Sequence, residues 1–199
     1  MAAPLSISHT HVHSLRISSG AEALVARVLG EDGGAGYGFT LNLDAAVARD
    51  MAAWDALGRR CGVPLCVLLG GARRRSVPIA RDESPTIAPD WEELRRGILA
   101  DRWTLLRIDP FAWSSVEWLQ TIAAAAQAFD LGIALLAPNA HGWEIGYCAA
   151  LAATLAGEDT RIIVRGAPPA ASVTVPDESG VGVDWSLEPA FAALQWQAG

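Results

Sequence analysis

The first part of the chain carries the apolar and polar pattern of three strands followed by one long helix. Alternation with a period of two and a glycine-rich turn at 31–34 indicate strands at 5–17, 21–29 and 37–41. Over 43–60 the apolar residues recur at spacings of three and four, which favours a helix with one buried face. Gly62 supplies a left-handed C-cap, and Pro64 prevents the helix from continuing.

Strand and helix patterns alternate through the middle of the chain. Short apolar strands are expected at 77–80, 105–108, 133–136 and 162–164. Helices are expected between them, at 90–100, 114–129 and 144–155. This alternation predicts parallel βα units, so the fold class is α/β. Ligands of parallel α/β proteins bind at the carboxyl ends of the strands, so candidate chemistry is sought in the residues that follow each strand.

The composition limits the classes of partner. The chain has 199 residues and a net charge of −7, which argues against a general nucleic-acid surface. No uncharged apolar run reaches the ~18 residues of a membrane span, so no membrane partner is expected. The start, MAAPLSISHTHVH, lacks the basic region and apolar block of a signal peptide, which predicts a cytoplasmic location. The short basic cluster at 73–75 is expected to be a solvated surface run.

Two residue types bear on the chemistry. All 15 basic residues are Arg, because the chain contains no Lys. A Lys Schiff base, a Lys general base and a Lys nucleophile are therefore excluded, and Arg cannot replace a Lys that must release its proton. Cys61, Cys66 and Cys148 lack the spacing of metal ligands, so they are expected to be free thiols in a reducing compartment.

Three His residues share one face of the first predicted strand. His9, His11 and His13 alternate with a period of two, which places neighbours ~6.6 Å apart. Adjacent pairs at that distance could share a metal ion, but three on one strand rarely do. Polar residues on an exposed strand face are the alternative, and the role of the three His residues is left open.

Five sequence motifs follow one another in the order found in a known superfamily. They are EALVARVLGEDGGAGYGF; DMAAWDALGRRCGVPLCVLLGG with ARRRSVPIA after it; WTLLRIDPF; IALLAPNAHGWEIGYCAALAATLAGED with RIIV after it; and VTVPDESGVGVDWSLE. They resemble the cap hairpin, the cap–barrel junction, the second barrel strand, the seventh to eighth strands and the closing loop of the enolase superfamily. The resemblance is to its mandelate racemase/muconate lactonizing branch, including the acid-sugar dehydratases, and covers most of the chain.

This resemblance implies a small α+β capping domain followed by an incomplete, about half, (β/α) barrel. A reduced capping domain at 1–72, a partial barrel at 73–170 and a C-terminal segment at 171–199 that returns to the cap are implied. The helix at 114–129 and the strand at 133–136 resemble the sixth helix and seventh strand, so the third to sixth strands are missing. Those strands carry the three carboxylates that hold Mg²⁺ in the superfamily. We therefore expect no metal site and no cofactor.

The catalytic positions of the superfamily have also changed. Residues 105–107, Leu-Leu-Arg, occupy the Lys-x-Lys position of the second strand. Asn139 stands where His usually follows Pro after the seventh strand, and Arg165 replaces the acid that ends the eighth. The metal-assisted enolisation of the superfamily therefore cannot be carried over to this chain.

Four strands predict an open sheet instead of a closed barrel. The expected neighbours are strands seven, eight, one and two, with a bare edge at each end. Exposed sheet edges invite pairing with another chain. We therefore expect a homodimer, in which two copies close a barrel or pack their sheets face to face.

The strand ends carry the candidate site residues. His141 is the candidate general acid/base near neutral pH, and Asp109 and Asp82 are the acids that would orient it. The candidate substrate-binding residues are Arg107, Arg165, Arg81, Asn139, Trp113 and Trp143. The guanidinium groups would hold a carboxylate of a small anionic substrate. The alternative is that Arg–Asp pairs only stabilise a damaged barrel and that the Trp residues fill the core.

Two functions remain open. The preferred one is a repurposed, metal-independent lyase, isomerase or cyclase that acts on a small carboxylate-bearing molecule, unsaturated ones included. The other is a catalytically inactive pseudoenzyme that serves as a binding or assembly subunit. Strand ends closed by apolar side chains or by Arg–Asp pairs would favour the pseudoenzyme.

Overall fold

The structure of the chain is a computed structural model. It describes residues 6–81, 92, 95–96, 105–112, 115–157, 159–166 and 169–196. Two candidate site residues, Asp82 and Trp113, lie outside the described residues, as does most of the helix expected at 90–100.

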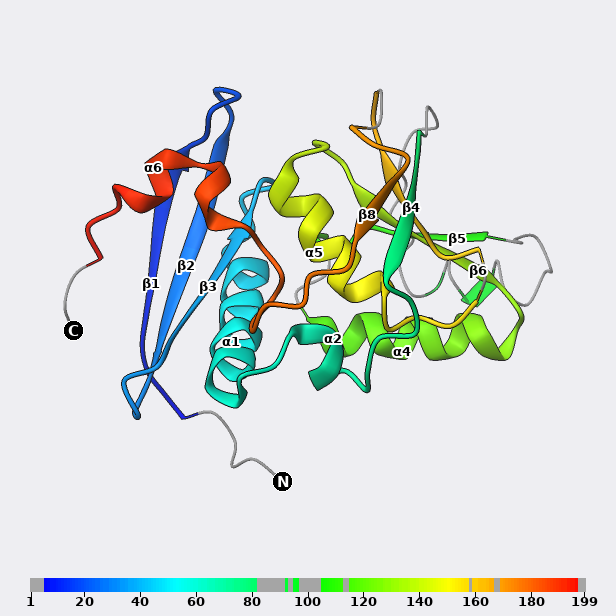
Figure 1. Cartoon of the computed structure of the whole chain (residues 1–199), viewed down its shortest axis with the longest axis horizontal. Helices are drawn as coiled ribbons and strands as arrows, with labels where there is room; N and C mark the ends of the chain where they lie inside the picture. Colours follow the sequence, from blue (N-terminus) through cyan, green and yellow to red (C-terminus); the bar gives the residue numbers. More distant parts are fainter. Residues whose placement is uncertain are drawn as a thin grey trace.

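The first unit is an antiparallel sheet covered by one helix (Figure 1). Its elements are β1 (Ile7–Arg16), β2 (Glu22–Gly30), β3 (Ala35–Thr40) and α1 (Ala45–Cys61). Asp44 caps α1 by accepting from the backbone N–H of Ala46, and Gly62 ends it with φ 67°. A side chain at Gly36 or Gly38 would collide with the backbone of α1, so the glycines of β3 allow this close packing.

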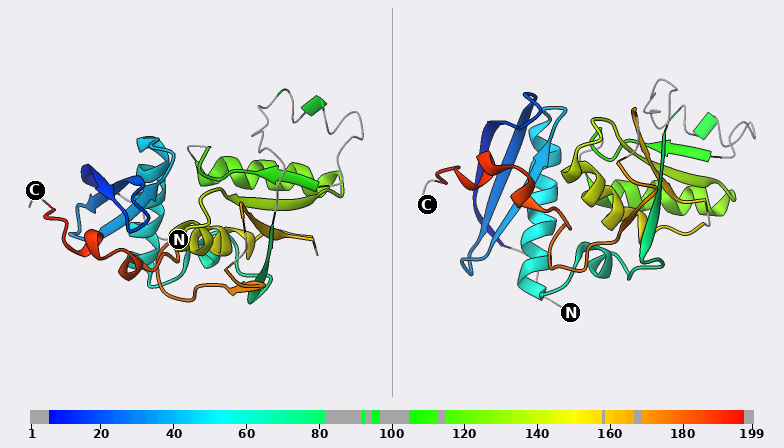
Figure 2. Two further views of the ribbon diagram at one scale, coloured as in Figure 1. Left: turned by 90° about the horizontal axis from the view of Figure 1, so that it is seen from above. Right: turned by 45° about the horizontal axis from the view of Figure 1, so that its top comes forward.

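The second unit is a five-stranded, mostly parallel sheet with helices on one face (Figure 1). In chain order its elements are α2 (Leu65–Leu68), β4 (Ser76–Arg81), β5 (Leu105–Ile108), α4 (Val116–Ala128), β6 (Gly132–Ala137), α5 (Gly142–Ala152), β7 (Arg161–Val164) and β8 (Ser172–Thr174). The strand order is β5-β6-β7-β4-β8, with β8 antiparallel to β4. Figure 2 shows α1 on the side of the three-stranded sheet that faces the second unit. The predicted α/β class, a small α+β capping unit followed by a partial barrel, is confirmed.

The predicted order of the parallel strands is wrong in one respect. The strand at 105–108 was expected beside the strand at 77–80, but β5 pairs with β6 in the register Leu106↔Ile133 and Ile108↔Leu135. The cause is the connection through α4, because a βαβ crossover places consecutive parallel strands side by side. On its other side β4 pairs with β8, so within the described part of the chain the edge strands are β5 and β8.

The last part of the chain returns to the first unit. It contains η1 (Trp185–Leu187) and α6 (Pro189–Ala192), which lie over the three-stranded sheet in Figure 1. The rings of Trp185 and Phe191 stack with centroids 4.6 Å apart, and both contact Tyr37. The limits 1–72, 73–170 and 171–199 stay our proposal for the division of the chain.

A buried carboxylate anchors the loop that leads into this segment. Asp55 on α1 accepts from the backbone N–H groups of Tyr37 and Val181 at 2.9 Å each, and from Arg59 Nε at 2.6 Å. Gly180 approaches with φ 104°, and a side chain there would overlap the Asp55 carboxylate. One acid therefore ties β3, α1 and the closing loop together.

In the basic cluster at 73–75, Arg73 and Arg75 are exposed, as expected, whereas Arg74 differs from that expectation. The Arg74 guanidinium is half-buried and donates to the carbonyls of Leu155 at 2.9 Å, Gly157 at 2.8 Å and Thr160 at 3.3 Å. These carbonyls belong to the loop between α5 and β7. Arg74 therefore stabilises this loop through three hydrogen bonds. Within the described residues, no helix has the length and apolar character to cross a membrane.

Candidate functional site

Three polar residues follow three neighbouring parallel strands and therefore lie at one edge of the sheet. Asp109 follows β5, Asn139 lies two residues after β6, and Arg165 follows β7. A fourth polar residue, Glu144, comes from the first turn of α5. The carboxyl ends of parallel strands are where ligands bind in this architecture. These four residues form what we call the strand-end cluster.

Glu144 is the most buried member of the strand-end cluster, with 1% of its surface exposed. The Asn139 backbone N–H donates to Oε2 and the Asn139 amide Nδ2 donates to Oε1, both at 2.8 Å. Burial raises the pKa of Glu144 to about 7, and the negative charge of Asp109 adds to the rise. The N–H groups of Asn139 and His141 act in the opposite direction. Glu144 can therefore both give and take a proton near neutral pH.

Asp109 is the second carboxyl of the cluster. Its Oδ1 accepts from the backbone N–H of Phe111 at 2.9 Å, which turns the chain directly after β5. Burial raises its pKa, whereas the N–H groups of Phe111 and Ala112 and the positive charge of Arg165 lower it. A carboxyl whose pKa is raised by the charge of a second carboxyl, with a guanidinium nearby, is an arrangement typical of sites that move protons.

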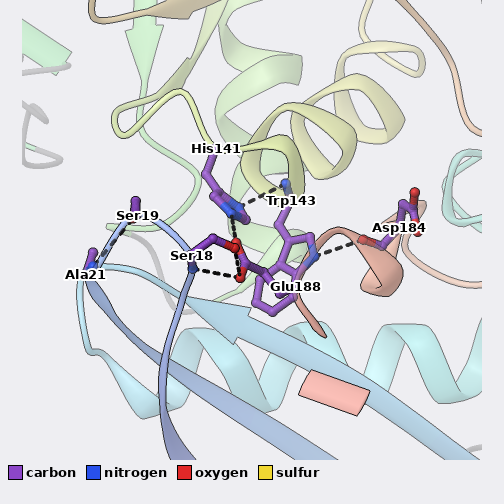
Figure 3. Close-up of polar contacts among 7 residues, drawn as sticks. All are labelled: Ser18, Ser19, Ala21, His141, Trp143, Asp184 and Glu188. Carbon is purple, nitrogen blue, oxygen red and sulfur yellow. Dashed lines mark hydrogen bonds and ion pairs between the residues drawn. The ribbon is translucent and has the colours of Figure 1, made fainter. Parts of the chain in front are cut away.

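His141 begins α5 and has both ring nitrogens engaged (Figure 3). Nδ1 accepts from the backbone N–H of Trp143 at 3.2 Å, so the ring carries its hydrogen on Nε2. Nε2 donates to Glu188 Oε1 at 2.8 Å. A general acid/base needs a ring nitrogen that faces the substrate. That role for His141 therefore stays a prediction that requires the contact with Glu188 to open.

Glu188 joins three segments that lie far apart in the sequence (Figure 3). Besides His141, its Oε2 accepts from the Ser18 backbone N–H at 2.8 Å and from the Ser18 Oγ at 2.6 Å. Burial would raise the pKa of Glu188, but these hydrogen bonds outweigh it and lower the pKa below its usual value. The order Ser–Glu–His differs from a Ser–His–acid triad, because the hydroxyl contacts a carboxylate and the imidazole cannot take its proton. We conclude that the group locks the β1–β2 turn to the closing segment.

The two predicted Trp contacts have different outcomes. Trp113 lies outside the described residues. Trp143 is fully buried, donates from Nε1 to the Asp184 carbonyl at 2.9 Å, and packs against Phe39 and Trp185. This position gives the ring a structural role between the two units, and its contact with a substrate stays a prediction.

The arginines reach different parts of the strand ends. Arg165 is exposed and follows β7, and its positive charge lowers the pKa of Asp109. Arg107 is half-buried on β5 opposite Ala134, and Arg81 is exposed at the end of β4 opposite Val164. Arg165 is therefore the predicted anion-binding residue that the structure places in the strand-end cluster.

The three His residues of β1 do not converge. The rings of His9 and His11 stack with centroids 6.4 Å apart, and that of His13 meets the edge of Trp196 at 5.0 Å. In the part of the chain that the structure describes, no three His, Cys, Asp or Glu side chains are placed to hold a metal ion. The role of the three residues stays open.

The superfamily resemblance implies a magnesium ion held by three carboxylates. The strand-end cluster provides two, and both Asp109 and Glu144 already accept N–H donors of the protein. Asp82 lies outside the described residues. A hard cation prefers several converging oxygens, so the described donor set does not fit magnesium.

Glu144 and Glu188 are the polar residues that the sequence analysis missed. Glu144 was placed only as the start of a helix, although it is the single acid in an otherwise apolar stretch, GWEIGYCAALA. That contrast was the available signal, because a charged residue on a buried helix needs a partner. Glu188 carried no such signal, since its partners Ser18 and His141 come from distant parts of the chain.

Comparisons with known proteins identify the fold. No family model matches the sequence, and no curated protein matches it. Among solved structures, an isomerase from Streptomyces coelicolor A3(2) is 14% identical with a TM-score of 0.76, covering 95% of this chain and 98% of that chain. A racemase from the same organism, with bound magnesium, is 14% identical with a TM-score of 0.71, covering 94% of this chain and 100% of that chain. A mandelate racemase/muconate lactonizing enzyme from Bordetella bronchiseptica RB50 is 13% identical with a TM-score of 0.71, covering 96% and 99%.

The chain therefore has the fold of mandelate racemase/muconate lactonizing enzymes of the enolase superfamily. The resemblance inferred from the five motifs is confirmed at the level of the fold. At these identities the comparisons concern the fold alone, and activity has to be argued from the strand-end cluster.

Proposed function

We propose that the protein is an isomerase- or lyase-type enzyme that moves a proton on a small carboxylate-bearing substrate at the strand-end cluster. One observation carries the proposal. Asp109, which is half-buried, and Glu144, which is buried, are two carboxyls with raised pKa values and lie at neighbouring strand ends together with Arg165. Such a pair is costly to keep in a folded chain, and enzymes keep it where protons are transferred. The isomerase and racemase with the same fold agree with this reaction class.

The proposed reaction assigns one role to each residue. Arg165 and, on β5, Arg107 would pair with the substrate carboxylate. The Glu144 carboxylate would take a proton from the substrate carbon that bears the substrate carboxylate. The electron pair of that C–H bond would move toward the substrate carboxylate, which the guanidinium groups hold. In an isomerisation, the protonated Glu144 would return the proton to a neighbouring carbon, and the negative charge of Asp109 would favour the uptake of the proton by Glu144. In an elimination, the electron pair would form a C=C bond, and a leaving hydroxide would take the proton from Glu144 and depart as water.

This proposal transfers the acid/base role from His141 to Glu144. Both ring nitrogens of His141 have protein partners in the structure. Glu144 has its pKa near 7 and lies beside a second carboxyl. The proposed chemistry uses no resident metal, since the negative charge that develops on the substrate would be met by guanidinium groups.

Solvent exchange tests the proposal without knowledge of the product. A panel of small 2-hydroxy and unsaturated carboxylates is incubated with the protein in D₂O, and deuterium uptake next to the carboxylate is followed by NMR. We expect uptake with the wild type and at least a hundredfold loss in Glu144→Gln. Glu117→Gln, an exposed acid in the first turn of α4, is the matched control and should retain exchange. Equal exchange in wild type and Glu144→Gln would disprove the assignment.

A non-catalytic binding or assembly subunit is the second candidate. Two observations favour it: the engaged nitrogens of His141, and the buried Trp143 that fills the space between the two units. A folded wild type that exchanges no member of the panel, yet binds a carboxylate in calorimetry, would support this function over catalysis.

Assembly and location are further parts of the proposal. We propose a homodimer, because β5 is a terminal strand of the sheet in the described part of the chain and its edge could pair with a second copy. We propose a cytoplasmic location because Cys61, Cys66 and Cys148 are free thiols. With a net charge of −7, no nucleic-acid partner is proposed.

A further inference from the structure

The loop between β6 and α5 is held in a strained shape. Ala140 has φ 51°, in the left-handed region that non-glycine residues rarely adopt. Its backbone N–H donates to the Ala137 carbonyl at 3.0 Å, and His141 follows at once as the N-cap of α5. This tight turn directs Asn139 back toward the first turn of α5. Strain of this kind persists only where the surrounding structure enforces it, and it gathers at functional sites.

Asn139 binds Glu144 with two groups, of which local structure needs only one. A glutamate in the first turn of a helix commonly accepts from a backbone N–H just before the helix. The backbone N–H of Asn139 supplies such a contact to Oε2. The Asn139 side-chain amide makes an additional bond to Oε1 at 2.8 Å. A purely structural cap does not require this second donor.

The two residues also differ sharply in their exposure. Asn139 is exposed, whereas Glu144 is 1% exposed. The amide therefore reaches the carboxyl from the solvent side. Exposed side chains change rotamer within nanoseconds, so the amide can turn away without any movement of the backbone.

We propose that Asn139 is a positioning residue that holds Glu144 in its charged form and covers it until substrate displaces the amide. The inference rests on the proposed role of Glu144 and adds how that residue is reached. When the amide leaves, the carboxylate loses a donor that favoured its charge, and its affinity for a proton rises. Glu144 would thus become a stronger base when the substrate arrives.

The titration of Glu144 tests whether Asn139 favours the charged form of its carboxyl group. The side-chain carboxyl carbon is followed by ¹³C NMR, with Glu144→Gln used to assign the signal. In Asn139→Ala and Asn139→Ser, which both keep the backbone N–H, the proton affinity of Glu144 should rise about tenfold. Gln120→Ala removes an amide bonded to Thr154 Oγ1 and is the matched control without effect. An unchanged Glu144 titration in both Asn139 variants would overturn the proposal.

Carboxyl labelling with a water-soluble carbodiimide tests whether the Asn139 amide shields Glu144 from solvent. Mass spectrometry should find Glu144 labelled about tenfold faster in Asn139→Ala than in the wild type or in Gln120→Ala, the increase expected from the loss of one charge-assisted hydrogen bond. Equal labelling rates would refute the covering role. Neither measurement needs turnover, so both decide the role of Asn139 even where the exchange assay finds no activity. Where exchange is found, the acid limb of its pH profile should move upward in Asn139→Ala, in step with the titration.

Discussion

Replacement of Glu144 by Gln should stabilise the protein near neutral pH while it abolishes proton exchange. Gln has nearly the same shape and removes the buried charge. A residue that served structure alone would lower stability when replaced, because its hydrogen bonds to Asn139 would be weakened. A residue kept for catalysis at the expense of stability should show the opposite sign.

The magnitude follows from the pKa of Glu144. Burial raises it from 4.5 to about 7, and each pKa unit corresponds to about 1.4 kcal/mol. The pKa of Glu144 is higher in the folded than in the unfolded protein, so burial of its carboxyl does not lower the free energy of unfolding of the wild type below pH 4.5. The wild type loses about 3 kcal/mol as the pH rises through 7. The Gln amide places an N–H opposite one N–H of Asn139, which costs about 1 kcal/mol at every pH. The variant should therefore be about 2 kcal/mol more stable at pH 8.5 and slightly less stable at pH 4.5.

Urea unfolding of both proteins at pH 4.5, 6, 7 and 8.5 measures this difference. The difference in free energy of unfolding should change sign between the lowest and highest pH, and Glu31→Gln, at an exposed acid in the turn after β2, should follow the wild type throughout. A difference that stays constant with pH would show that Glu144 titrates normally, and the argument for a proton-moving site would fail.

Four further predictions follow from the packing. Gly180→Ala should lower the free energy of unfolding by at least about 3 kcal/mol, because the new side chain overlaps the carboxylate of Asp55. Gly33→Ala, also at positive φ but in open space, should lower it by about 1 kcal/mol. Thermal unfolding of the two variants measures the difference. Glu188→Gln should lower the free energy of unfolding by about 1–3 kcal/mol. A double-mutant cycle with His141→Ala should give a coupling energy near 1 kcal/mol, because the two side chains are hydrogen-bonded. Additive effects of the two substitutions would contradict this. Asp50→Asn should raise the free energy of unfolding by about 1 kcal/mol above pH 6 and leave it unchanged near pH 4, because burial raises the pKa of Asp50 to about 6. Urea unfolding at the two pH values measures this, and an increase at both would contradict the prediction. Light scattering at micromolar concentration should give twice the chain mass, and a single-chain mass would rule out the homodimer.

The local patterns of the sequence predicted most of the elements. The helix expected at 43–60 is α1 at Ala45–Cys61, with Gly62 as its left-handed C-cap. The strand expected at 105–108 is β5 with the same limits. Periodicity and capping are local properties, and here no tertiary contact overrides them.

Two features of the sequence favour different strand orders. The resemblance placed the strand at 105–108 beside the strand at 77–80. The short connection through α4 favours instead the pairing of β5 with β6, which is what the structure has. Chain connectivity prevailed because parallel strands joined by a βαβ crossover usually lie side by side.

The candidate site was less predictable than the fold. Asp109, Asn139 and Arg165 could be assigned to one sheet edge, because each follows a parallel strand. The engagement of His141 could not be foreseen, since its partner Glu188 lies in the closing segment of the chain. Burial of Glu144 likewise arises from packing between elements, which periodicity does not specify.

The most direct test is the pKa of Glu144 in the wild type and in Asp109→Asn, read from the carboxyl carbon by NMR. We predict a midpoint near 7 in the wild type and a lower midpoint in Asp109→Asn, because a neighbouring negative charge has been removed. A midpoint near 4.5 in both proteins would contradict the account, since Glu144 would then be an ordinary carboxylate with no proton to exchange at neutral pH.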